Sequence, residues 1–104
     1  MTAMEKFNLV KRACDEQKAC QLQYKDETAF RTIFPLGICL TFNRGMVIVG
    51  CVQESSTTKE TLLKNFPMED CDNIRILERK FTVWPDFKKA MKICDDWLFH
   101  VNPE

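Results

Sequence analysis

The sequence predicts an α+β domain with an N-terminal helix, a small antiparallel β-barrel of about five strands and a C-terminal helix. Apolar residues recur with a period near 3.6 at both ends of the chain, and with a period near two or in short runs between them. The short strands follow one another through tight turns, which leaves no room for the long crossovers of a parallel sheet. A small antiparallel barrel or a strongly bent sheet is therefore favoured, and closing the strands into a barrel removes exposed edges. The length of 104 residues, 45% of them hydrophobic, fits a single domain over residues 1–104.

The first helix is predicted over residues 1–19. Thr2 and Glu5 have the spacing of a capping box. A stripe of apolar residues with helical spacing follows, and it consists of Ala3, Phe7, Val10 and Cys14. This amphipathic pattern predicts a helix that covers one end of the barrel.

The barrel itself is predicted over residues 20–83. The period of the apolar residues changes to two at Cys20 and continues through Leu22 and Tyr24, so one face of this strand is expected to be buried. A polar turn over residues 25–28 follows the strand.

Two more strands are expected at residues 30–34 and 38–42. They are separated at Pro35 and Gly37, because a proline cannot donate a hydrogen bond to a central ladder. Residues 43–45 have the composition of a tight hairpin turn.

The apolar run at residues 46–52 is long enough only for a strand that is buried on both faces. Residues 53–60 are polar and predict a surface loop. Residues 61–68 are interpreted as a further strand or a short irregular stretch, and residues 74–81 as the last strand of the barrel.

A closing helix is predicted over residues 84–99. Trp84, Pro85 and Asp86 provide a helix start. One apolar stripe then follows, and it consists of Phe87, Met91, Cys94, Trp97 and Leu98. Such a stripe is more typical of a core-facing helix than of a cofactor site, and no cofactor is expected.

The six cysteines predict reduced core thiols rather than a disulfide framework. Free cysteines behave as small hydrophobic residues in apolar patterns, which is the setting of Cys14, Cys39, Cys51 and Cys94. The chain shows no secretory leader and no run of the length that a membrane span requires, so a cytoplasmic protein without membrane contact is expected. The closest pair, Cys14 and Cys20, is too widely spaced for a zinc knuckle, and no metal site is expected.

Candidates for catalysis are few, and the chain is not expected to be an enzyme. His100 is the only histidine, and it lies near the end of the sequence, where a solvated tail residue is expected. Asp95 and Asp96 are adjacent on the predicted helix and would point about 100° apart, so they cannot share a site. No glycine-rich phosphate loop is present. No catalytic residue is therefore assigned.

Charge is balanced over the whole chain but not along it. The 15 basic and 15 acidic residues argue against a protein that binds nucleic acid by general phosphate attraction. Residues 31–68 contain four basic and two acidic side chains, whereas residues 69–104 contain six basic and eight acidic ones. The positive region could recognise an anion locally, or it could be ordinary variation over a solvated surface.

Several motifs follow one another in a recognisable order. They are Tyr24 at a strand end, Arg31, Pro35-Leu36-Gly37, Gly45 before the apolar run, and Lys64 two residues before Phe66. In order and spacing, residues 9–81 resemble the WYL domain, which occurs mostly in bacterial transcription regulators and phage-defence systems. The resemblance implies an Sm-like or SH3-like small β-barrel. It also implies a basic groove for nucleotides or single-stranded nucleic acid.

The chain departs from the WYL pattern at two places. Met46-Val47-Ile48 stands where the family has Trp-Tyr-Leu, which keeps an apolar strand and loses the tyrosine hydroxyl. Pro67 and Asp70 stand where the family has arginines, and an acid repels a phosphate. The remaining candidates for ligand contact are Tyr24, Arg31, Lys64 and, in the same positive region, Arg44.

The resemblance implies a non-enzymatic regulatory or accessory module that acts by binding. Because the arginine positions are lost, a protein partner is the favoured target. The alternative is a sensor of a nucleotide or single-stranded nucleic acid, in which Tyr24 stacks on a base while Arg31 and Lys64 contact phosphates. Assembly into a homo-oligomer through strand edges is a further expectation. No segment is left to read a major groove, so a standalone accessory protein or an excised domain is expected.

Two of the candidates also have a purely structural explanation. Tyr24 could be a core residue of its alternating strand. Arg31 could form a structural ion pair with Glu69 or Asp70, the acidic residues near the lost arginine positions.

Overall fold

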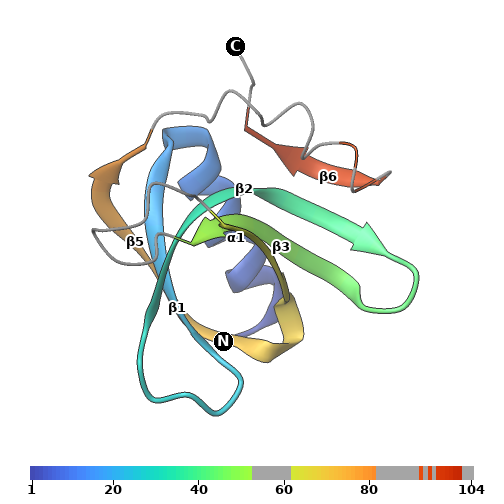
Figure 1. Ribbon diagram of the computed structural model, residues 1–104, viewed down its shortest axis with the longest axis horizontal. Helices are drawn as coiled ribbons and strands as arrows, with labels where there is room; N and C mark the ends of the chain where they lie inside the picture. The colour runs from blue at the N-terminus through green and yellow to red at the C-terminus, as the bar shows by residue number, and fades with distance from the viewer. Residues whose placement is uncertain (53–61, 82–91, 93, 95, 102–104) are drawn as a thin grey trace.

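The computed structural model shows a bent antiparallel sheet with one helix packed against it (Figure 1). The structure describes residues 1–52, 62–81, 92, 94 and 96–101. Its elements are α1 (Ala3–Glu16), β1 (Lys18–Tyr24), β2 (Arg31–Thr41), β3 (Gly45–Val52), β4 (Leu62–Pro67), the 3-10 turn η1 (Met68–Asp70), β5 (Cys71–Lys80) and β6 (Trp97–His100).

The strands lie in the order β4-β3-β2-β1-β5, and β6 pairs with β2. All described pairs are antiparallel. β4 and β5 lie at opposite ends of this order, although η1 alone connects them along the chain, so the sheet must bend strongly. α1 packs against β1, β2 and β5. The main core lies between this helix and the sheet.

The predicted fold class is wrong at the C-terminal end. Residues 97–100, which were assigned to a closing helix at 84–99, form the strand β6. On one edge of β2, only residues 31–33 pair with β1. The backbone groups of β2 beyond that point need another hydrogen-bonding partner, and β6 provides it at residues 37–39 of β2. This tertiary pairing overrides the helical spacing of the apolar residues. Residues 84–91, also assigned to that helix, lie outside the described part.

The sheet also differs from the predicted closed barrel. Among the described strands, no hydrogen-bonded ladder joins β4 to β5. The strands therefore form an open, bent sheet whose two end strands are connected by η1. The last predicted strand, at residues 74–81, is the greater part of β5 and is followed by β6.

The predicted capping box at the start of α1 is confirmed. The backbone N–H of Glu5 donates to Thr2 Oγ1 at 3.1 Å, and the backbone N–H of Thr2 donates to Glu5 Oε1 at 3.2 Å. The helix ends at Glu16, earlier than the predicted boundary at residue 19. Gln17 adopts a left-handed conformation with φ of 51°, which ends the helix and directs the chain into β1.

β2 is one strand of 11 residues rather than the two strands expected. Pro35 lies between the ladder with β1 and the ladder with β6, next to a register shift in the pairing with β3. A residue without an N–H is tolerated at such an irregularity. The proline therefore marks the place where β2 changes partner on one edge.

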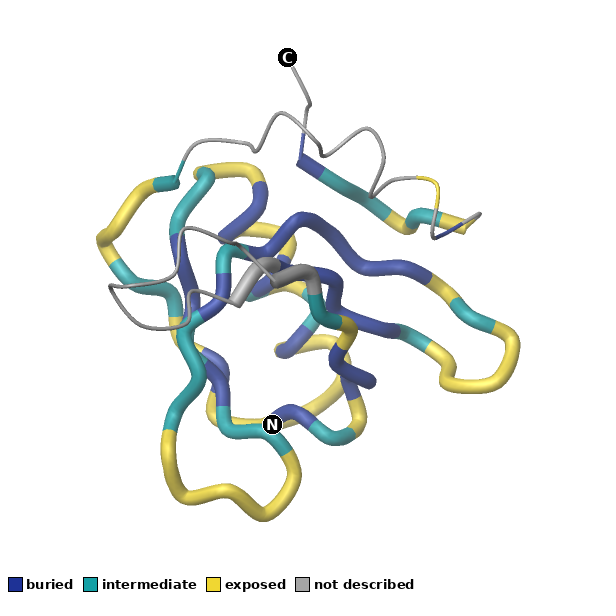
Figure 2. The backbone as a smooth tube through the Cα atoms, in the orientation of Figure 1, coloured by how far each residue is buried: buried dark blue, intermediate teal, exposed yellow. Residues whose placement is uncertain are grey.

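The predicted hairpin is confirmed, and the strand after it is buried on both faces at residues 47–50. Thr41 faces Gly45 across the turn, and Gly45 has φ of +66°, a conformation that favours glycine. Ile48 belongs to the main core under α1, whereas Val49 packs with Cys39 in a second cluster. Figure 2 shows the buried middle of β2 and β3 and the exposed hairpin tip.

The expectation of reduced core thiols holds for Cys14, Cys20 and Cys71, which are free and buried. It is wrong for Cys39 and Cys94, which form a disulfide between β2 and the segment before β6. In the described part of the chain, no helix has the length and apolar character that crossing a bilayer requires.

Candidate functional site

Three of the four candidate ligand residues lie close together. Tyr24 ends β1, Arg31 begins β2 and Lys64 lies in β4. Arg31 lies over the ring of Tyr24 and pairs with the carboxylate of Glu27 in the turn between β1 and β2, and the charge of Lys64 also acts on this carboxylate. We call Tyr24, Glu27, Arg31, Lys64 and the neighbouring Phe66 the Arg31 cluster.

Two aromatic rings form the base of the Arg31 cluster. The rings of Tyr24 and Phe66 meet edge to face, with their centroids 5.1 Å apart. Phe66 is only 2% exposed and belongs to the main core, whereas Tyr24 is half-buried and packs against that core. The structural interpretation of Tyr24 as a core residue is therefore partly right, since one part of its ring surface is still accessible.

The guanidinium of Arg31 lies over both rings. Its central carbon is 5.3 Å from the Tyr24 centroid and 5.9 Å from the Phe66 centroid, within the range of cation–π attraction. Nε of Arg31 donates to Glu27 Oε2 at 3.0 Å, and Nη2 donates to Oε1 at 2.5 Å. The ion pair of Arg31 is thus with Glu27, four residues before it, and the alternative of a pair with Glu69 or Asp70 is wrong.

The electrostatics of the cluster favour a negative group at its centre. The hydrogen bonds from Arg31 lower the pKa of the Glu27 carboxyl, and the nearby charges of Arg31, Lys25 and Lys64 add to this effect. The ammonium of Lys25 also lies 5.3 Å from the centroid of the Tyr24 ring. The charges of three cationic side chains therefore act on a single carboxylate.

The turn between β1 and β2 holds Glu27 in place. Lys25 has a positive φ of 54°, and its backbone N–H donates to the carbonyl of Asp70 at 2.7 Å. The backbone N–H of Glu27 donates to the carbonyl of Tyr24 at 3.2 Å. These contacts fold the turn back over the ends of the two strands, so the carboxylate of Glu27 reaches Arg31.

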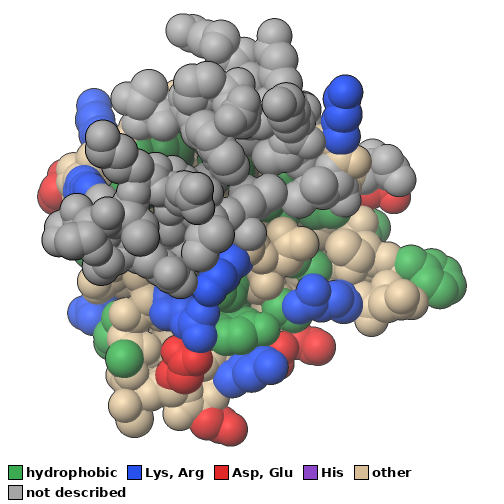
Figure 3. Space-filling model, in the orientation of Figure 1, with side chains coloured by type: hydrophobic (Ala, Val, Ile, Leu, Met, Phe, Trp, Pro, Cys, Tyr) green, Lys and Arg blue, Asp and Glu red, His purple; other side chains and the backbone are tan. Residues whose placement is uncertain are grey.

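The surface view agrees with this mixture of charges. Figure 3 shows lysine and arginine side chains gathered beside aspartate and glutamate side chains on one part of this face. This face therefore carries basic and acidic side chains side by side and is not uniformly positive.

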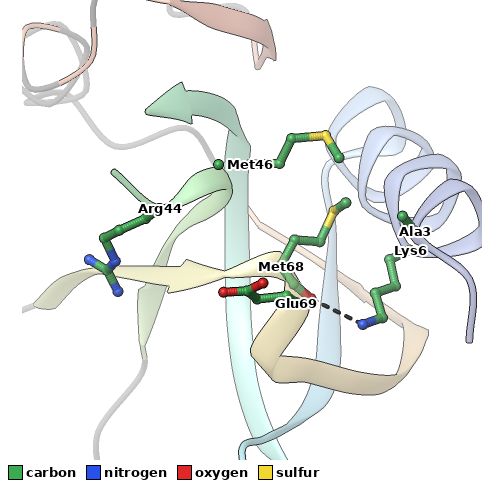
Figure 4. A pocket seen from close by; sticks show the side chains of 7 residues that line it. Ala3, Lys6, Arg44, Met46, Met68 and Glu69 are labelled. Carbon is green, nitrogen blue, oxygen red and sulfur yellow. Dashed lines mark hydrogen bonds between the residues drawn. The ribbon is translucent and has the colours of Figure 1, made fainter. Parts of the chain in front are cut away.

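Arg44, the fourth candidate, lies elsewhere. It belongs to the turn between β2 and β3 and lines a cavity of about 190 Å³ together with Lys6, Met46, Met68 and Glu69 (Figure 4). The sequence-based grouping of Arg44 with Arg31 is therefore not supported by their positions.

Sequence reasoning did not identify Glu27 or Lys6 as site residues. The sequence indicates only a polar turn at Glu27, although this residue stands four positions before Arg31, a spacing that a short turn can close. Lys6 is buried on the same face of α1 as Val10 and Ala13. Its spacing of four and seven residues from them was the available signal.

His100 is a strand residue rather than a solvated tail residue. It lies half-buried in β6, with Nδ1 at 2.8 Å from the carbonyl oxygen of Val101 and its ring edge to face with Trp97. Within the described residues, no group of three histidine, cysteine, aspartate or glutamate side chains could hold a metal ion.

Comparison with protein-family models and with curated proteins gives no match for this chain. The resemblance to the WYL domain therefore rests on the motifs in the sequence. The geometry of the Arg31 cluster is independent of that resemblance, because it follows from the positions of the side chains themselves.

Proposed function

We propose that this protein is a non-enzymatic, WYL-like regulatory module that binds a nucleotide or a single-stranded nucleic acid at the Arg31 cluster. The observation that supports this function is the convergence of Tyr24, Arg31 and Lys64 from three different strands. Sequence alone favoured a protein partner, because family arginines are missing. The convergence of the remaining three residues shifts the balance toward the phosphate ligand.

The residue types in the cluster match this class of ligand. Aromatic rings and arginine planes provide stacking surfaces for bases, which every base can use. A guanidinium pairs with a phosphate through two parallel hydrogen bonds, the same arrangement that Arg31 now makes with Glu27. The Arg31 and Glu27 side chains are 31% and 42% exposed, and exposed ion pairs stabilise a fold by only about 0–1 kcal/mol. A phosphate can therefore replace the carboxylate at low cost.

The test is fluorescence anisotropy with labelled oligothymidylate and oligouridylate, at low and at physiological salt, with ATP as a competitor. Arg31→Ala is expected to weaken binding about tenfold or more, because it removes a charged two-point contact. Lys64→Ala is expected to weaken binding less, because it removes a single phosphate contact. The loss of this contact is also expected to reduce the salt dependence of binding.

Arg12 provides a matched control. It forms an exposed ion pair with Glu16, also four residues apart, but on α1. Arg12→Ala removes the same charge and is expected to change the affinity by less than about twofold. Absence of binding at both salt concentrations, or an equal loss in the Arg12 and Arg31 variants, would show that the Arg31 cluster is not the site.

A protein partner is the second candidate function. Phe42 at the tip of the hairpin between β2 and β3 is fully exposed, and Leu40 beside it is 46% exposed. Large apolar side chains at the tip of a hairpin are typical of a contact surface. Sedimentation across a concentration range tests self-association, and Phe42→Ser is expected to weaken it. A monomer at all concentrations whose partner binding is unchanged by Phe42→Ser would exclude this surface.

We also propose a cytoplasmic location, which agrees with the three free buried thiols. The disulfide between Cys39 and Cys94 is the feature that tests this location, because stable disulfides are rare in that compartment. Rapid alkylation of intact cells, followed by mass spectrometry, measures whether the two sulfurs are bonded. A fully bonded pair in cells would contradict a cytoplasmic location.

A further inference from the structure

Lys6 is a buried cation that forms no ion pair with a carboxylate of the described residues. Its side chain extends from α1 toward η1, and the residue is only 9% exposed. Its Nζ donates one hydrogen bond, of 3.1 Å, to the carbonyl of Met68. No carboxylate of the described residues lies within 4.0 Å of Nζ. An ammonium has three N–H groups, and a buried charge is costly unless it is paired.

The ammonium of Lys6 borders the cavity of about 190 Å³ between α1, the hairpin and η1. In Figure 4 the side chains of Met46 and Met68 extend toward α1, and Lys6 reaches toward the backbone of Met68. The carboxylate of Glu69 and the guanidinium of Arg44 lie on the side away from Lys6. The lining thus combines a buried cation, two thioether side chains and a mixed pair of charges at the periphery.

A second, apolar hollow adjoins this cavity. It has a volume of about 440 Å³, is more open, and shares Ala3 and Met46 with the cavity at Lys6. Met4 and Phe7 of α1 also line it, and Met4 is 73% exposed. The exposed side chain of Met4 and the partly buried ring of Phe7 provide an adaptable apolar surface for a ligand. The charged end and the apolar end together have the form of a site for an amphiphile.

We propose that the cavity at Lys6 and the adjoining hollow together bind an aliphatic monocarboxylate, with its carboxylate on Lys6 Nζ and its hydrocarbon chain along Met46 toward Met4 and Phe7. Two lining cations and one lining carboxylate give a net charge of +1, which matches a single negative charge. Glu69 opposes a second negative charge, so the site selects a carboxylate over a phosphate dianion. The site is separate from the Arg31 cluster and does not depend on the function proposed for it.

The test is an NMR titration of the wild-type chain with octanoate, hexanoate, octanol and octyl phosphate. Octanoate is expected to bind about tenfold more tightly than octanol, which has the same chain and no charge. Hexanoate is expected to bind more weakly than octanoate, by about two- to fourfold for each methylene removed. Octyl phosphate is expected to bind more weakly than octanoate because of Glu69. The shifted amides are expected at the start of α1, at Met46 and at η1.

Two lysine variants test whether the ammonium of Lys6 binds the carboxylate of the ligand. Lys6→Met keeps an unbranched side chain and removes the ammonium, so the preference for octanoate over octanol is expected to disappear. Lys11→Met removes an exposed lysine that pairs with Asp15 on the same helix, and the preference is expected to remain. If Lys6→Met does not fold, the relative affinities of the four ligands for the wild-type chain still test the proposal.

The proposal is overturned if octanoate and octanol bind the wild-type chain equally, or if neither binds. It is also overturned if octyl phosphate binds as tightly as octanoate, or if Lys11→Met loses the preference as Lys6→Met does.

Discussion

Arg31 donates two hydrogen bonds to the carboxylate of Glu27 at the turn between β1 and β2. Nε lies 3.0 Å from Oε2, and Nη2 lies 2.5 Å from Oε1. The pair forms over the rings of Tyr24 and Phe66. A phosphate would accept hydrogen bonds from the same Nε and Nη2 groups of Arg31, so Glu27 and a phosphate ligand would compete for this side chain. In the function proposed above, the carboxylate would therefore lower the affinity for a phosphate and keep Arg31 oriented before the phosphate binds.

Glu27→Gln is expected to raise the affinity for oligothymidylate by about three- to tenfold, because it keeps the shape of the side chain and removes the competing charge. Arg31 lowers the pKa of Glu27, so the carboxylate stays charged at neutral and mildly acidic pH. The gain is therefore expected to be constant over this pH range. Fluorescence anisotropy at several pH values measures it.

Glu78 serves as the control for this change. Its side chain is 95% exposed and pairs with Lys18 at the far end of β1, so Glu78→Gln alters the net charge by the same amount. It is expected to change the affinity by less than about twofold. If Glu27→Gln binds no more tightly than Glu78→Gln, competition by the Glu27 carboxylate is disproved, whether or not the wild-type chain binds.

The position of Tyr24 and Arg31 could be predicted from the sequence in large part. Two antiparallel strands joined by a short polar turn bring the end of one beside the start of the next. The role of Glu27 could not be predicted, because it depends on how the turn folds back, and this is fixed by the hydrogen bond from Lys25 to the carbonyl of Asp70, 45 positions later in the sequence.

The strand β6 could not be predicted from local pattern. Cys94, Trp97 and Leu98 fit a helical period, and only the unpaired backbone of β2 beyond Ile33 shows that a strand is needed there. The same limit applies to Lys6, because a charged residue on an amphipathic helix is ordinarily placed on the solvent side. The strand β6 and the burial of Lys6 both depend on tertiary contacts, which the spacing of residues along the chain does not show.

The buried thiols predict a loss of stability in alkaline solution. Burial raises the pKa of Cys20 and of Cys71 from 9.0 to about 12, and it also raises that of Cys14. In the unfolded chain these thiols ionise near pH 9, whereas in the folded chain they stay neutral. The stabilisation is therefore fully present below about pH 9 and is lost as the pH rises toward 12, by about 1.4 kcal/mol per pH unit for each thiol.

Urea unfolding between about pH 7.5 and about pH 10.5 measures this loss. Cys20→Ala is expected to show a shallower decline, because one titrating group is removed. A wild-type midpoint that stays constant above pH 9, or an equally steep decline in Cys20→Ala, would show that the thiols do not govern the alkaline transition.

The disulfide between Cys39 and Cys94 is expected to stabilise the attachment of β6. The two residues are separated by 55 positions, and closing a loop of this length stabilises a fold by about 2–4 kcal/mol. Dithiothreitol is therefore expected to lower the urea midpoint of the wild-type chain. It is expected to leave the Cys39→Ser, Cys94→Ser double variant unchanged. Equal midpoints of the wild-type chain with and without the reductant would contradict this role.

Gly37 determines whether β6 can approach β2. A Cβ at this position would lie 2.9 Å from the Cα of His100 and 2.9 Å from Cζ3 of Trp97, and closer still to the carbonyl oxygen of Phe99. Backbone atoms cannot move aside as a flexible side chain does, so Gly37→Ala is expected to separate β6 from β2 and to destabilise the fold by about 1–3 kcal/mol. Hydrogen exchange at the amides of β6 measures the separation.

Gly45→Ala distinguishes this steric effect from a general cost of replacing glycine. Gly45 has φ of +66° and open space around it, so the substitution costs about 1–2 kcal/mol of backbone strain at the hairpin without touching β6. The amides of β6 are expected to lose protection in Gly37→Ala and to keep it in Gly45→Ala. Retained protection in Gly37→Ala would mean that β6 tolerates a side chain between the strands, whereas loss in both variants would mean that β6 depends on overall stability rather than on this contact.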